Sequence, residues 1–186
     1  MSLDEALMEG EEVMEKAVNY MTREFASIRT GKASPALVEN LDVEAYGSNM
    51  KLKQLALITT PEARLIVIQP FDASTLKDIE RAISESRLGI HPATEGKLIR
   101  LPIPELSEER RRDLVRTLKQ IGEETRVRVR SGRRQAIDAV KKIQKEGGIT
   151  EDELRLGEKQ IQELTDKYTS TIEEQLTKKE AEIMKV

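Results

Sequence analysis

Apolar residues recur at helical spacing along three long segments of this chain, and this pattern restricts the fold more than any other feature. In the first segment they return every seven residues from Leu7 to Ile28. A seam with that period is typical of a helix that packs lengthwise against another helix. Ser2 and Glu5 have the spacing of a capping box, so the sequence predicts a helix over residues 3–29.

The other two seams lie in the second half of the chain. One apolar face continues for about 40 residues from Ser107, or ~60 Å of helix. Thr150 and Glu153 predict a second capping box, after which a third seam runs from Leu154 to Ile183. Seams of this length can be buried only against one another, so the sequence predicts an elongated antiparallel three-helix bundle.

The segment between the first two helices changes to strand-like patterns. Its apolar residues alternate or cluster in short β-rich runs, at 41–46, 55–59, 65–71 and 97–104. Thr60 and Pro61 fit a turn between two of these runs. Ser74 is expected to cap an amphipathic helix over residues 74–89. Together these patterns indicate a small β/α/β domain.

The predicted fold class is therefore α+β. We assign residues 1–30 and 105–186 to the bundle, and residues 31–104 to the inserted β/α/β domain. Glycine and proline mark the two connectors between these parts, since both residue types interrupt helices. The predicted hinge consists of Thr30, Gly31, Lys32, Pro102, Pro104 and Glu105.

The composition excludes several kinds of site. The chain has no cysteine, so neither a disulfide nor a thiolate zinc site can form. His91 is the only histidine, and a turn or surface role is expected for it. No glycine-rich phosphate loop is present in the sequence. We therefore expect no catalytic residue, no metal, no cofactor and no enzyme activity; an enzyme with an unusual carboxylate site is a disfavoured alternative.

The sequence also lacks the signals of a membrane or secreted protein. It has no apolar run of the ~20 residues that a membrane-spanning helix needs. Its acidic N-terminal stretch lacks the apolar centre of a secretory signal. We therefore expect a cytoplasmic monomer with no membrane partner.

Positive charge is concentrated on the second long helix. The formal net charge of the chain is −3, but Glu108–Lys145 holds 13 basic and 6 acidic residues, a local charge of +7 against −10 elsewhere. At its centre, the stretch RVRVRSGRR (126–134) has five arginines in nine residues. The alternation in RVRVR resembles a strand, but strand pairing would interrupt the helical seam, so we interpret the stretch as helix. Gly132 falls on the apolar side, where it permits close approach of a neighbouring helix.

Most of these arginines share one face of the helix, beside the seam. This basic stripe contains Arg126, Arg130, Arg133 and Arg134, with Arg112, Arg116, Lys119, Lys141 and Lys145 in the same sector, whereas Arg128 points away. No acidic residue lies between Glu124 and Asp138, so we expect no ion pair at i,i+4 to neutralise the centre.

The stripe suits a nucleic-acid backbone. Guanidinium groups bind phosphates through two hydrogen bonds, and the stretch has no aromatic residue on which a base could stack. The pattern therefore predicts contact with phosphates rather than sequence reading. Two alternatives are a charged face that serves only solvation, and a helical scaffold that binds acidic protein partners.

Several separated blocks match a known family in order and spacing. They are IRTGKASPALVENLDVEAYG (28–47), the pairs Leu88-Gly89 and His91-Pro92, LPIPELSEERRRDL (101–114), RVRVRSGRR (126–134) and KEAEIM (179–184). Over essentially its full length, the chain resembles the ribosome recycling factor family. It departs from the family pattern at Gly132 and His91, which leaves the arginines unaffected.

The resemblance implies an L-shaped, tRNA-like protein whose bundle and β/α/β domain are joined by a flexible hinge. It implies that the protein, with elongation factor G and GTP hydrolysis by that partner, splits post-termination ribosomes into subunits and releases mRNA and deacylated tRNA. The family motif implies that Arg130, Arg133 and Arg134 bind RNA of the large ribosomal subunit, as does Arg29 through IRTG. We add Arg126 and Arg112 to this RNA-binding set because they lie on the stripe.

Overall fold

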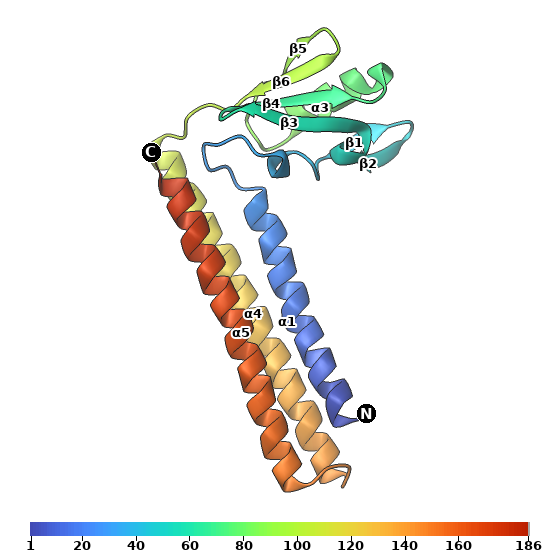
Figure 1. Ribbon diagram of the computed structural model, residues 1–186, viewed down its shortest axis with the longest axis vertical. Helices are drawn as coiled ribbons and strands as arrows, with labels where there is room; N and C mark the ends of the chain where they lie inside the picture. Colours follow the sequence, from blue (N-terminus) through green and yellow to red (C-terminus); the bar gives the residue numbers. More distant parts are fainter. Residues whose placement is uncertain (186) are drawn as a thin grey trace. The chain divides into compact units, whose positions relative to one another are not determined.

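The computed structural model describes residues 1–185, which form two compact units. The bundle unit consists of Met1–Phe25 and the described residues from Arg112 onward, and the sheet unit is Ala26–Arg111. The predicted α+β class is confirmed, because three long helices form a bundle and a small antiparallel sheet unit is inserted between the first two (Figure 1).

Three helices build the bundle unit: α1 (Leu3–Ala26), α4 (Glu108–Lys145) and α5 (Glu151–Met184). In chain direction α4 is antiparallel to the other two (Figure 1). The predicted seams form the core, as shown by the full burial of Met14, Val129 and Ile172. Removing one such side chain from water contributes ~1.5–3 kcal/mol, so the seams are the main source of stability in this unit.

Both predicted capping boxes are present. The Glu5 amide donates to Ser2 Oγ at 3.1 Å, and the Ser2 amide donates to the Glu5 carboxylate at 2.9 Å. Thr150 and Glu153 make the same pair of bonds at 3.2 and 2.7 Å. Each box satisfies amide groups that a helix N-terminus would otherwise leave without partners.

Two glycines allow α1 and α4 to lie close together. A Cβ on Gly132 would lie 3.0 Å from Val13 Cγ1, and a Cβ on Gly10 would lie 2.7 Å from the Cβ of Ala136. The prediction that Gly132 permits close helix approach is therefore confirmed. The α4 helix continues through Gly132 without interruption.

The sheet unit contains two antiparallel sheets. The strands β1 (Asp42–Ala45) and β2 (Ser48–Lys51) form a hairpin. The larger sheet has the strand order β3-β4-β6-β5, with bounds Ala56–Glu62, Leu65–Pro70, Leu98–Pro102 and Ala93–Glu95.

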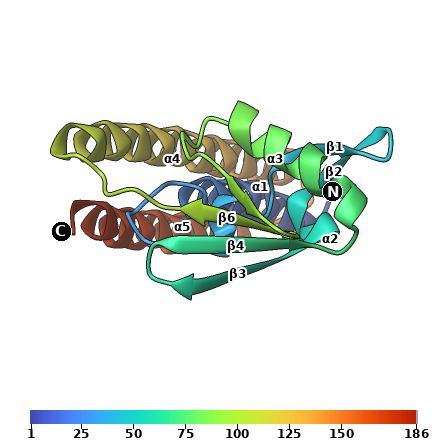
Figure 2. The same cartoon turned by 90° about the horizontal axis from the view of Figure 1, so that it is seen from above.

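Helix α3 (Leu76–Glu85) lies along one face of the larger sheet (Figure 2). The inward side chains of β4 and β6 are fully buried together with two isoleucines of α3; these residues are Ile66, Ile68, Ile99, Leu101, Ile79 and Ile83. A short helix, α2 (Leu52–Leu55), and the 3-10 turns η1 (Pro35–Leu37) and η2 (Ala73–Thr75) complete the unit.

Three local predictions were wrong or incomplete. Thr60 and Pro61 lie within β3, because β3 is an edge strand, where a proline interrupts no ladder on its free side. The cap before α3 is Asp72, whose side chain accepts a hydrogen bond from the Ser74 amide at 2.9 Å, and not Ser74. The short strands β2 and β5 were not predicted.

Both connectors are bonded within the sheet unit. Pro102 is the last residue of β6 and is paired with Leu65, whereas Thr30–Lys32 lie outside any helix or strand. Arg29 Nη2 donates to the carbonyl of Pro104 at 2.9 Å, which joins one connector to the other. Glu105 forms an ion pair with Arg64 at 2.6 Å. On the second connector, the predicted hinge residues Pro102, Pro104 and Glu105 therefore each have a bonded partner.

Candidate nucleic-acid interface

The basic stripe lies on α4 beside its buried seam. Every fourth or third residue of α4, including Val129 and Ala136, is buried by the other helices, and this fixes the direction of the arginines between them. Arg130 has 58% of its side chain exposed, whereas Arg126 has 24%. The stripe is therefore not uniform, and its members differ in how available they are to a ligand.

Arg126 is held by two carboxylates. Its Nε donates to Glu173 of α5 at 2.7 Å, its Nη2 also contacts the same carboxylate oxygen, and Nη1 donates to Glu123 at 3.1 Å. The Glu173 hydrogen bond raises the pKa of Arg126 above its ordinary value. Arg126 thus stabilises the contact between α4 and α5, and fewer of its donors remain for a phosphate.

Glu123 also binds the exposed Arg130, whose Nη2 donates to its second oxygen at 3.0 Å. The hydrogen bond from Arg130 has the largest effect in lowering the pKa of Glu123, and the bond from Arg126 lowers it further. As expected, no ion pair at i,i+4 forms at the centre of the stripe among the described residues, but carboxylates at other spacings partly neutralise it. Glu123 reaches one arginine three residues along the helix and another seven residues along, and Glu173 comes from a different helix, so a search at i,i+4 misses both.

Arg133 and Arg134 have no carboxylate partner within the described chain. Arg133 Nε donates to the side-chain oxygen of Gln162 at 2.8 Å, which orients the guanidinium along the α4–α5 boundary without neutralising it. Arg134 is exposed and forms no ion pair with residues 1–185. Arg112 is also exposed, near the start of α4. Positive charge that remains available is therefore centred on Arg133 and Arg134, with Arg130 shared.

Arg29 belongs to the sheet unit, in the connector that follows α1. It is half-buried, and its donor to Pro104 ties the two connectors together. Its Nε is buried without a hydrogen-bond partner in the described structure. Burial, and then the positive charge of Arg110, lower the pKa of Arg29. These contacts give Arg29 a structural task that the sequence did not reveal.

The structure brings together a second group of basic residues, which the sequence did not single out. They line a groove of about 700 Å³ between α1 and α4, formed by Val13, Lys16, Ala17, Asn19, Tyr20, Arg23, Arg128 and Ser131. Arg128, the arginine that points away from the stripe, lies with its Cζ 5.2 Å from the centre of the Tyr20 ring. A signal was present, since Tyr20 is the one exposed aromatic residue of α1.

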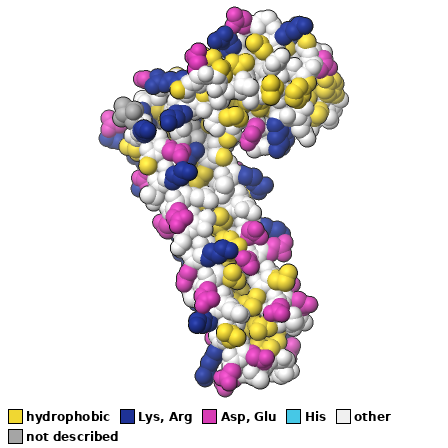
Figure 3. Space-filling model, viewed as in Figure 1, with side chains coloured by type: hydrophobic (Ala, Val, Ile, Leu, Met, Phe, Trp, Pro, Cys, Tyr) yellow, Lys and Arg dark blue, Asp and Glu magenta, His cyan; other side chains and the backbone are white. Residues whose placement is uncertain are grey.

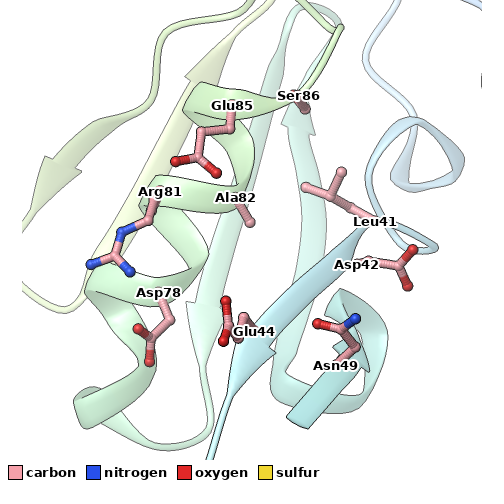
Figure 4. A pocket seen from close by; sticks show the side chains of 9 residues that line it. All are labelled: Leu41, Asp42, Glu44, Asn49, Asp78, Arg81, Ala82, Glu85 and Ser86. Carbon is pink, nitrogen blue, oxygen red and sulfur yellow. The ribbon is translucent and has the colours of Figure 1, made fainter. Parts of the chain in front are cut away.

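A hollow on the sheet unit has the opposite character. It has a volume of about 380 Å³ and lies between the β1–β2 hairpin and α3 (Figure 4). Its lining includes four carboxylates, Asp42, Glu44, Asp78 and Glu85, and a single cation, Arg81. Its negative charge makes it unsuited to phosphates.

Neither a metal-binding cluster nor a membrane-spanning helix is found among residues 1–185. No group of three or more acidic or histidine side chains is placed to hold a metal ion. None of the helices in this part of the chain is long and apolar enough to cross a membrane. His91 lies exposed in the loop before β5, as expected for a surface residue. On the face seen in Figure 3, acidic and basic side chains are intermingled along the bundle.

These features define a class of protein: a three-helix bundle with an inserted antiparallel sheet unit and a basic face on its second long helix. The model of the family described as ribosome recycling factor matches residues 21–184. The chain belongs to the ribosome recycling factor family.

The relatives agree over the full length. The chain is 56% identical to the ribosome-recycling factor of Akkermansia muciniphila, with 100% of both chains covered. It is 50% identical to that of Chloroflexus aurantiacus, covering 99% of this chain and 100% of the relative.

Two solved structures are also similar. A solution structure of the ribosome recycling factor has a TM-score of 0.82 at 45% identity, covering 100% of this chain and 99% of the other. A second, with a TM-score of 0.71 at 42% identity and complete coverage of both chains, is described as models for the T. thermophilus ribosome recycling factor and the E. coli elongation factor G bound to the E. coli post-termination complex.

Proposed function

We propose that this protein binds ribosomal RNA of the large subunit through α4 and, together with elongation factor G, splits post-termination ribosomes into subunits. The observation that supports this most is the unneutralised pair Arg133 and Arg134, on a chain that belongs to the ribosome recycling factor family. A relative bound with elongation factor G on a post-termination complex supports the choice of partner.

The arginines have unequal parts in this proposal. Arg133 and Arg134 supply phosphate contacts directly, and Arg130 supplies one when it leaves Glu123. Arg126 mainly positions α5, so its contribution to RNA binding is indirect. Arg112 extends the surface toward the start of α4, and Arg29 acts from the connector. Phosphate contacts of this kind position a protein on RNA without reading its sequence.

The energy for splitting the ribosome comes from a partner protein and not from this chain. We propose that GTP hydrolysis by elongation factor G supplies the energy, and that mRNA and deacylated tRNA are released. The protein acts as a cytoplasmic monomer with no catalysis or cofactor of its own. The proposed hinge is the predicted set Thr30, Gly31, Lys32, Pro102, Pro104 and Glu105, through which a push on the sheet unit reaches the bundle unit.

Arg133→Ala combined with Arg134→Ala tests the proposal. Binding to isolated large subunits is measured across a salt series, and splitting is followed by light scattering of post-termination ribosomes with elongation factor G and GTP. We expect weaker binding, a salt dependence flattened by about one unit of slope per lost contact, and slower splitting.

The matched control is Arg155→Ala, an exposed arginine on α5 that lies outside the stripe. It removes one side chain of the same type, half the charge that the double variant removes, and we expect binding close to that of the unchanged protein. If the double variant bound large subunits with unchanged affinity and salt slope, the proposed role of the stripe would be wrong. Splitting by the unchanged protein without elongation factor G would contradict the proposed source of energy.

A further inference from the structure

The α1–α4 groove is a second basic feature of the bundle surface, separate from the stripe. Three of its lining side chains are cationic, Lys16, Arg23 and Arg128, and none is a carboxylate. Lys16 is paired with Glu12 at 2.6 Å. Arg23 and Arg128 have no ion pair with any of residues 1–185, so they keep their full charge toward the groove.

Tyr20 lines the same groove as these two arginines. It belongs to α1, and 42% of its surface is exposed. The Arg128 guanidinium over the ring, at 5.2 Å from its centre, restrains the ring by a cation–π contact. An exposed ring held in place loses little freedom when a flat ligand stacks on it.

The remaining lining residues suit a nucleotide. Val13 and Ala17 provide apolar lining, and Asn19 and Ser131 provide neutral donors and acceptors. Close packing at Gly132 fixes the position of Val13, so the groove does not depend on a mobile loop. Proteins that bind single-stranded nucleic acid combine aromatic stacking platforms with cationic groups for the backbone in this way.

We propose that this groove binds an unpaired nucleotide of RNA, with its base stacked on Tyr20 and its phosphates near Arg23 and Arg128. The inference rests on the proposed function in taking RNA as the ligand, and it adds a second contact on a different flank of α4. An acidic peptide would match the cations, but it would gain nothing from a restrained aromatic ring.

The test uses the full chain and a fluorescein-labelled single-stranded RNA of about ten nucleotides, within the usual range of site sizes. Affinity is measured by fluorescence anisotropy. Tyr20→Leu keeps an apolar side chain but removes the stacking surface, so we expect about tenfold weaker binding. Tyr20→Phe keeps the ring and should restore affinity, and Arg128→Ala should flatten the salt dependence by about 0.7 units.

Tyr46→Leu is the matched control, because Tyr46 is an exposed tyrosine of the sheet unit, 64% exposed, and lies outside the groove. Circular dichroism establishes that each variant is folded. If Tyr20→Leu did not fold, Arg23→Ala, which changes an exposed side chain, would supply the same comparison. Unchanged affinity of both groove variants would overturn the proposal.

A poly-glutamate peptide of equal charge is added as a competitor. Displacement of the RNA by this peptide, with the same dependence on Tyr20, would assign the groove to acidic protein partners and overturn the proposal. The test of the groove can fail independently of the test of the stripe. The stripe variant, Arg133→Ala with Arg134→Ala, leaves Tyr20 intact, and its effect is measured as binding to large subunits.

Discussion

Glu123 is the residue that most limits the positive charge of the stripe. Its two oxygens accept hydrogen bonds from Arg126 and Arg130, and these bonds lower its own pKa. Both arginines must exchange this carboxylate for a phosphate before they contribute fully to RNA binding. The carboxylate therefore competes with the ligand that we propose.

Glu123→Gln removes that competitor, and we expect a severalfold increase in affinity for large ribosomal subunits at moderate salt. The cause is the release of Arg130 and of one donor of Arg126, whose other donors stay bonded to Glu173, together with the loss of one negative charge. Glu124→Gln is the control, because Glu124 is adjacent, carries the same charge and accepts a hydrogen bond only from Gln120. Equal affinities of the two variants would mean that Glu123 does not restrain the arginines.

Tyr168 is a second residue whose pKa is shifted by its environment. Its hydroxyl donates to Glu11 at 3.0 Å, across the α5–α1 contact. Burial, followed by the Glu11 bond, raises the pKa of Tyr168 to about 12. In an unfolded chain the pKa of tyrosine is about 10.

The raised pKa predicts a loss of stability in alkali. Above pH ~10 the unfolded chain releases the tyrosine proton while the folded protein keeps it, so stability falls as the pH rises toward 12. Tyr168→Phe should make the free energy of unfolding, measured by denaturant titration, fall less steeply over this range. At neutral pH it should cost about 1 kcal/mol for the lost hydrogen bond. Parallel slopes for the two proteins would contradict the prediction.

The packing of α1 on α4 depends on glycine. Gly10→Ala would place a Cβ 2.7 Å from that of Ala136, closer than two such atoms can lie. We expect the helices to separate locally at a cost of about 1–3 kcal/mol, which exceeds the gain of about 1 kcal/mol in helix propensity. Thermal or denaturant unfolding measures the difference.

A double-mutant cycle isolates the steric cause. Ala136→Gly removes the opposing Cβ, so the combination with Gly10→Ala should be more stable than the sum of the two single changes predicts. Additive effects would show that the contact is relieved by other means.

At the level of elements, the sequence predicted what depends on local patterns. The three seams, both capping boxes and the role of Gly132 were confirmed, because each depends on spacing along one helix. The place of Pro61 was not predictable, since whether a strand is at a sheet edge depends on pairing over long distances. The pairing of Arg126 with Glu173 and the Tyr20–Arg128 contact join different helices, and their register along each other cannot be read from one helix.

At the level of the whole molecule, each unit has a hydrophobic core of its own. The sheet-unit core, which includes Ile79, Ile83 and Ile99, draws all its members from within residues 26–111. Ile172 is fully buried in the bundle unit. The chain crosses between the units only twice, at 25–26 and at 111–112. Units with separate cores and few covalent links unfold as separate cooperative parts. A substitution that destabilises one core should therefore leave the stability of the other unit unchanged.

Ile83→Ala should therefore lower the stability of the sheet unit by about 2–5 kcal/mol and leave the bundle unit unchanged. Native-state hydrogen exchange of the full chain measures this, because amides of β4 and β6 should lose protection while those of α4 and α5 keep it. Ile172→Ala is the matched change in the bundle unit and should give the reverse pattern. If either variant lost protection equally in both units, the two units would unfold together. The proposed push on the sheet unit would then be resisted by the stability of the whole chain rather than by the connectors alone.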